Sequence, residues 1–239
     1  QIPPMDDATY ARMKAETNRW YWYGIPTFFR APWNENPAEA DIALVGVPHS
    51  SGNGSTERDQ HLAPRFMRHV SCWYKRAHFK YQLNPWTECR INDLGDTPLP
   101  EAMVNDISVQ HIEAFYKRLD AAGTRPVSVG GDHSITGPIL KAIAGKDARI
   151  SKGRKAALVH FDAHTDSYDH IPHWLGAVRS AAHWASYAAI EGHIDTSKSV
   201  QLGISGNVVT LDWRKSSDRL GYRVITIDEY RELGVQKTI

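Results

Sequence analysis

The chain has 239 residues, of which 41% are hydrophobic and 23% charged, a composition that suits one globular domain with a filled core. Its 28 basic and 27 acidic residues leave a formal charge of +1, which gives no basic footprint for nucleic acid or an anionic membrane. The longest apolar runs are strand-sized, far below the roughly 18 residues of a membrane span. Cys72 and Cys89 have no C-x-x-C spacing, so a zinc ribbon and a disulfide framework are not indicated, and we expect a reducing cytoplasm.

The first 40 residues differ from the rest and are expected to form an N-terminal arm. Residues 5–20 can form an amphipathic helix, and residues 19–33 are dense in Trp, Tyr and Phe. Aromatic density of this kind usually indicates packing or a contact between subunits, and a substrate lid is the alternative. Residues 41–239 are expected to form one α/β domain.

Beyond the arm, short apolar runs alternate with segments of helical periodicity. The expected strands are Ile42–Val47, Pro126–Gly130, Ala156–Phe161 and Ser199–Ile204, and the helical segments include Ile107–Ala121 and Ser180–Glu191. Such alternation predicts stacked βαβ units around a parallel sheet. Ligands bind at the carboxyl ends of the strands in an open sheet of this kind, so polar residues at those ends are the candidates for a functional site.

The strand at 126–130 runs into Gly131-Asp132-His133-Ser134. The glycines permit a tight turn, which delivers His133 to the carboxyl end of that strand. Alone, such a histidine is more often a structural residue whose ring is satisfied locally. It becomes a candidate metal ligand only beside the cluster that follows the next strand.

The strand at 156–161 runs directly into Asp162-Ala163-His164-Thr165-Asp166. Asp162, His164 and Asp166 occupy positions i, i+2 and i+4, so an extended backbone would turn all three side chains to one side. The alternative is a strand that leaves the sheet through a polar loop. With His133, these residues offer only oxygen and imidazole nitrogen, a donor set that favours manganese or nickel over a structural zinc site.

The two motifs at 130–134 and 162–166, in this order, resemble the first two signature motifs of the ureohydrolases, the arginase and agmatinase superfamily. The similarity extends from about Asp41 to the end of the chain. It implies a three-layer α/β sandwich with a mostly parallel central sheet, and we expect the C-terminal part of that fold to be missing. In the family, a later strand supplies an Asp-x-Asp pair and a downstream glutamate receives the guanidinium. No residue of this sequence fills either role.

The resemblance also implies roles for the candidate residues. Two divalent ions, Ni²⁺ or Mn²⁺, would be held by His133, Asp162, His164 and Asp166. Asp166 would also orient the nucleophile. His183 matches the position of the family's proton-shuttling histidine, and a side chain with a pKa near 6.5 suits that task. A structural histidine at the start of a helix is the alternative for His183.

Within the superfamily, residues 23–30 and 48–61 look most like the guanidine and biguanide hydrolases, which are associated with nickel. The leading expectation is therefore hydrolysis of a guanidino-type C–N bond in guanidine, a biguanide or a related small compound. The products would be urea or a guanylurea-type compound plus an amine or ammonia. Tyr168, His173 and Trp174, in the loop after Asp166, are candidate substrate contacts, since aromatic rings can face a cation, although aromatic side chains are more often packing.

Several alternatives remain open at this stage. An agmatinase or guanidinobutyrase is the nearest enzymatic rival. A non-catalytic subunit that supports an active homologue in a mixed oligomer would account for the absent ligands. A deacetylase-like amide hydrolase shares the fold, but the intact histidine motif favours two metals over one. The resemblance further implies a trimer or hexamer of identical or related subunits.

Overall fold

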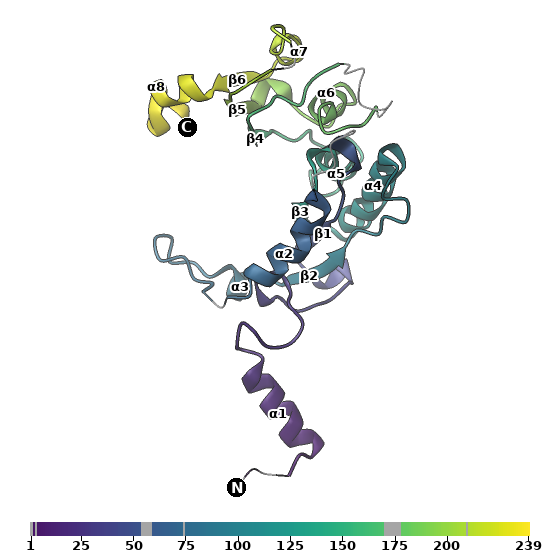
Figure 1. Cartoon of the computed structure of the whole chain (residues 1–239), viewed down its shortest axis with the longest axis vertical. Coiled ribbons are helices and arrows are strands. Elements are labelled where there is room, and N and C mark those ends of the chain that lie inside the picture. Colours follow the sequence, from purple (N-terminus) through teal and green to yellow (C-terminus); the bar gives the residue numbers. More distant parts are fainter. Residues whose placement is uncertain (1, 3, 54–58, 74, 170–177, 209) are drawn as a thin grey trace.

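The structure, a computed structural model, describes residues 2, 4–53, 59–73, 75–169, 178–208 and 210–239 (Figure 1). The strands are β1 (Ile42–Val47), β2 (Ile91–Asp96), β3 (Arg125–Gly130), β4 (Val159–Phe161), β5 (Val200–Ile204) and β6 (Arg223–Thr226). The helices are α1 (Asp7–Thr17), α2 (Ala63–Val70), α3 (Pro85–Glu88), α4 (Asn105–Ala122), α5 (Thr136–Ile143), α6 (Trp184–Ile190), α7 (Lys215–Leu220) and α8 (Ile227–Thr238). None of the helices in these ranges is long and apolar enough to cross a membrane.

The first sheet contains three parallel strands in the order β2-β1-β3. β1 has the bounds predicted from its apolar run, and β3 includes one residue more than predicted. Side chains of a strand alternate between the two faces, and Ala43, Val45 and Val47 accordingly join the core formed with α4 and α5. Leu44 points to the opposite face and packs with Phe28. The central strand β1 is therefore covered on both faces.

The second sheet contains three parallel strands in the order β4-β5-β6. Its core joins α6 to the sheet, because Trp184 packs in one cluster with Ile204 of β5 and Val224 of β6. β4 begins at Val159, later than the predicted start at Ala156, and Ala156 itself forms only an isolated bridge. Both sheets confirm the predicted α/β class with parallel strands.

The arrangement of the strands differs from the single central sheet expected from the sequence. β3 and β4 are edge strands of separate sheets, and they are not paired with each other in the part of the chain that the structure describes. Three apolar side chains on these edges are largely exposed: Val127 at 51%, Val159 at 63% and Phe161 at 73%. Since parallel strands are usually buried on both faces, β3 and β4 present apolar surface that the described residues do not cover.

The N-terminal arm begins with α1, which projects away from both sheets (Figure 1). The prediction of a helix in residues 5–20 is confirmed. The prediction that it is amphipathic is wrong, because its apolar residues do not gather on one face and none of its residues is buried. The exposed rings of Trp20 and Trp22 stack with their centroids 5.0 Å apart, whereas Phe28 lies in the core. A role for the arm in subunit contacts or as a lid stays a prediction.

Arg68 of α2 and Asp93 of β2 form a buried ion pair that joins the end of the arm to the first sheet. The Arg68 Nε donates to Asp93 Oδ2 at 2.8 Å, and Nη2 donates to Oδ1 at 3.0 Å. Asp93 is fully buried and also accepts a hydrogen bond from the backbone N–H of Phe28 at 2.9 Å. The Arg68 guanidinium lies 4.2 Å from the centroid of the Phe28 ring. The buried carboxylate of Asp93 is therefore neutralised by the buried guanidinium of Arg68.

Replacing Arg68 by Met should lower the free energy of unfolding by roughly 3–5 kcal/mol, because Asp93 would remain as a buried charge without its partner. For a chain of this size the melting temperature should fall by roughly 6–20 °C. The double variant R68M/D93N removes both charges and should recover a large part of that loss. Urea and thermal unfolding followed by circular dichroism measure both changes. A single variant as stable as the parent would show that the ion pair does not hold the arm.

Candidate metal centre

His133 is placed by a tight turn at the end of β3. Gly131 has φ +75°, and a Cβ added there would lie 2.5 Å from the backbone oxygen of Val47, so only glycine fits this turn. Asp132 then begins the short 3-10 turn that carries His133, and its Oδ1 accepts from the backbone N–H of Ser134 at 2.8 Å. The backbone N–H of Gly52 donates to the other oxygen of Asp132 at 2.7 Å. Local sequence and a neighbouring loop together fix the position of His133.

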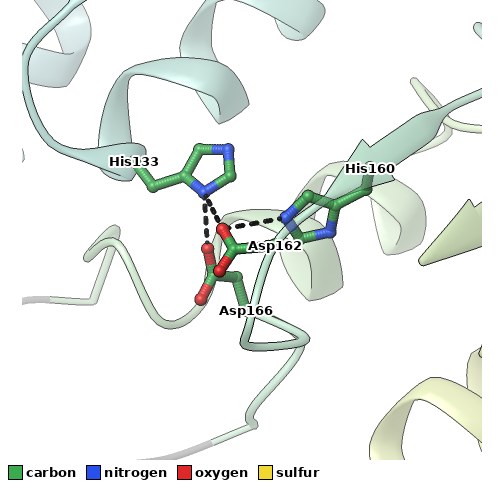
Figure 2. A group of neighbouring side chains, drawn as sticks. All are labelled: His133, His160, Asp162 and Asp166. Carbon is green, nitrogen blue, oxygen red and sulfur yellow. Dashed lines mark hydrogen bonds and ion pairs between the residues drawn. The ribbon is translucent and has the colours of Figure 1, made fainter. Parts of the chain in front are cut away.

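Four side chains from the ends of β3 and β4 meet beside α6. His133, His160, Asp162 and Asp166 each offer one ligand atom, and these atoms all lie within 4.8 Å of one another. Figure 2 shows that one ring nitrogen of His133 faces the carboxylates of both Asp162 and Asp166. This nitrogen, Nδ1, lies 3.0 Å from Asp162 Oδ2 and 2.7 Å from Asp166 Oδ2. His160 Nε2 lies 3.3 Å from the same oxygen of Asp162. Imidazole nitrogen and carboxylate oxygen are ligands suited to divalent transition metals, so the group fits a metal centre.

The charges in this group stabilise one another. Burial alone would lower the pKa of His133, but its hydrogen bonds to Asp162 and Asp166 raise that pKa to about 9. Burial would raise the pKa of Asp162, and the hydrogen bonds from His133 and His160 instead hold it well below its usual range. His133 is therefore protonated at neutral pH in the metal-free protein. A metal ion must displace that proton to use the same nitrogen, so metal uptake should weaken as the pH falls.

The structure places His160 in the group and His164 outside it. The sequence argument assumed an extended backbone from Asp162 to Asp166, but β4 ends at Phe161 and the chain then bends. The His164 side chain is 58% exposed, and its Nδ1 lies 3.6 Å from Asp162 Oδ1. His160 was missed, although the period of two that links alternate residues of a strand leads backward from Asp162 to it. The ligand roles of all these residues stay predictions.

A chain of buried polar side chains supports His160 and the loop after β4. Gln201 of β5 is fully buried, donates through Nε2 to the Thr165 carbonyl at 2.5 Å, and lies 3.5 Å from His160 Nδ1. The Ser217 hydroxyl donates to Gln201 Oε1 at 2.6 Å and lies 2.6 Å from the Ser167 hydroxyl. Outer contacts of this kind orient the side chains that could bind a metal.

The other predicted site residues have different positions. His183 is buried immediately before α6, and its Nδ1 lies 2.6 Å from the Ser180 hydroxyl; it is not one of the four clustered side chains. The backbone of Tyr168 is tied to the start of α6, where its N–H donates to the Ala182 carbonyl at 3.1 Å. His173 and Trp174 lie outside the described residues.

Comparison with known proteins shows the family to which the chain belongs. Residues 40–239 match the arginase family. The chain is similar to guanidinopropionase from Pseudomonas aeruginosa, with 37% identity over 218 residues that cover 90% of this chain and 64% of that protein. It is also similar to agmatinase from Neisseria meningitidis serogroup C, with 32% identity over 219 residues, 89% of this chain and 64% of that one.

The fold is similar to that of proclavaminate amidino hydrolase from Streptomyces clavuligerus. The TM-score is 0.78 at 26% identity, and the match covers 92% of this chain and 68% of that structure. The chain thus spans less than two thirds of the length of the two curated relatives, and about two thirds of the solved one.

Proposed function

Because the chain belongs to the arginase family, we propose that it acts as a metal-dependent hydrolase of a guanidino-type C–N bond. The observation that carries the proposal is the convergence of His133, His160, Asp162 and Asp166 near the carboxyl ends of β3 and β4, each of which is a strand of a parallel sheet. This is where ligands bind in open α/β sheets. The names of the similar proteins, guanidinopropionase and agmatinase, supply the substrate class.

We propose that divalent ions, Mn²⁺ or Ni²⁺, bind in this group through His133, Asp162 and Asp166, with His164 or His160 as the remaining imidazole. Bound there, they would lower the pKa of a water molecule toward about 7 and so provide a nucleophile strong enough for a guanidinium. Besides binding metal, Asp166 would orient the nucleophile.

The departing amine has to leave protonated, and His183 is our candidate for that proton. Its Nδ1 lies against the Ser180 hydroxyl at 2.6 Å, which assigns proton transfer to Nε2. The side chain is buried immediately before α6. A positioned imidazole can act as a general acid near neutral pH, as proton transfer to the departing amine requires.

For the substrate, two possibilities follow from different observations. The resemblance of residues 23–30 and 48–61 to the guanidine and biguanide hydrolases favours guanidine or a biguanide as the substrate. The similarity to guanidinopropionase and agmatinase favours a larger guanidino compound, with either a carboxylate or an amine at its far end. His173 and Trp174, two of the candidate substrate contacts, lie outside the described residues. We therefore propose the guanidino group as the shared substrate feature.

A panel of substrates tests the function. The purified protein, loaded separately with Mn²⁺ or Ni²⁺, should release urea from at least one of guanidine, 3-guanidinopropionate, 4-guanidinobutyrate and agmatine, or guanylurea from a biguanide. The ratio of kcat/KM values across the panel identifies the group at the far end, since a lost polar contact changes that ratio strongly. Metal binding without turnover of any of these compounds would instead support a non-catalytic subunit of a mixed oligomer.

A further inference from the structure

Trp184, the first residue of α6, lies directly against the candidate metal centre. Its side chain is fully buried, and its ring centroid is 4.6 Å from that of His133 and 5.1 Å from that of His160. The indole Nε1 donates a hydrogen bond to Asp166 Oδ2 at 2.9 Å. Trp184 therefore contacts three of the four clustered side chains, and it reaches one of them through its only polar atom.

α6 also holds the backbone of Asp166. Asp166 has φ +48°, a left-handed conformation that is uncommon for any residue except glycine and requires support from its surroundings. The backbone N–H of Ala185 donates to the Asp166 carbonyl at 3.0 Å. Two consecutive residues of α6 thus hold Asp166. Ala185 holds the main-chain carbonyl of Asp166, and Trp184 holds its side-chain carboxylate.

The hydrogen bond from the indole determines how the carboxylate of Asp166 is presented. Oδ2 accepts from Trp184 and lies 2.7 Å from His133 Nδ1, whereas none of the described residues donates a hydrogen bond to Oδ1. A buried indole N–H needs an acceptor, so the bond is costly to break from either side. It fixes the rotation of the carboxylate and leaves Oδ1 available to a cation.

We propose that Trp184 is a positioning residue of the metal centre, which orients Asp166 through its N–H and the two imidazoles through its ring. The inference rests on the proposed function, because it concerns the same metal centre. Polar groups that orient ligands from outside typically contribute 10- to 100-fold to metal affinity or activity. The ring alone would contribute packing, which a phenylalanine can largely replace.

The variant W184F tests the N–H contact. Titration of the metal-free protein with MnCl₂ and with NiCl₂, followed by calorimetry, should show an affinity about 10- to 100-fold weaker than that of the parent. The matched control is W213F, because Trp213 packs partly buried against the same core cluster as Trp184 but is not part of the metal centre. W213F should bind either metal as tightly as the parent.

A second variant separates the N–H from the size of the ring. Incorporation of 3-benzothienylalanine at position 184 replaces the N–H by sulfur with almost no change of shape, so it keeps the packing even where W184F folds poorly. It should show the same weakening of metal affinity as W184F. Affinity within about twofold of the parent in this isostere would overturn the inference while leaving the proposed function intact. A parent protein that binds neither metal would contradict the proposed function itself, and this inference with it.

Discussion

Asp162→Ala is expected to remove most of the bound metal and to lower urea release by about 10³-fold or more. Asp162 is the residue that links the group, since its Oδ2 lies within 3.3 Å of nitrogens from both His133 and His160. Loss of metal removes several kcal/mol of stabilisation from the reaction, and about 4 kcal/mol corresponds to 10³-fold in rate. Elemental analysis of the variant, together with urea release at saturating substrate, measures both effects.

The control is Asp212→Ala, which removes an exposed carboxylate outside the group. It should leave metal content and rate unchanged. Unchanged metal content in Asp162→Ala, with the fold intact by circular dichroism, would refute the metal assignment.

The same measurements on His160→Ala and His164→Ala decide between two predictions. The sequence motif assigns a ligand role to His164, whereas the structure brings His160 into the group. If His164 binds metal in the loaded protein, its removal should release metal although its side chain is 58% exposed here. If His160 is the ligand, or the main support of Asp162, its removal should have the larger effect.

His183→Asn is expected to leave metal content and folding intact while lowering kcat by roughly 10²- to 10⁴-fold, the usual contribution of a positioned acid or base. Asparagine is smaller than histidine, but its amide can take the place of Nδ1 beside the Ser180 hydroxyl, so the fold should survive. The loss should shrink for a substrate whose leaving amine has a lower pKa, because such a group departs more readily without a proton. Urea release from two substrates that differ in this pKa measures the dependence.

A matched control for His183 is His193→Asn. His193 contacts the Ala144 carbonyl through Nδ1 at 2.7 Å and is not part of the clustered group. It should leave kcat and its dependence on the leaving group unchanged. Equal activity of parent and His183→Asn on both substrates would remove His183 from the mechanism and leave it a structural role.

The sequence by itself determined the features that depend on neighbours along the chain. The apolar run at Ile42–Val47 becomes β1 with the same bounds. A strand that is buried on both faces needs apolar side chains on both, so its sequence is a continuous apolar run. The glycine turn that delivers His133 could also be predicted, since only glycine tolerates the backbone conformation at Gly131. The position of a polar cluster at the strand ends follows from the same local patterns.

Contacts between distant segments decided which side chains enter the cluster. The direction of a side chain beyond the end of a strand depends on where the chain turns, and residues far along the sequence set that turn. Gln201 holds the carbonyl of Thr165, and Ala185 holds that of Asp166. With the backbone bent in this way, His164 faces outward and His160, still within β4, faces the carboxylates. The position of Trp184 beside Asp166 likewise arises from the packing of α6 on the second sheet, which no local pattern encodes.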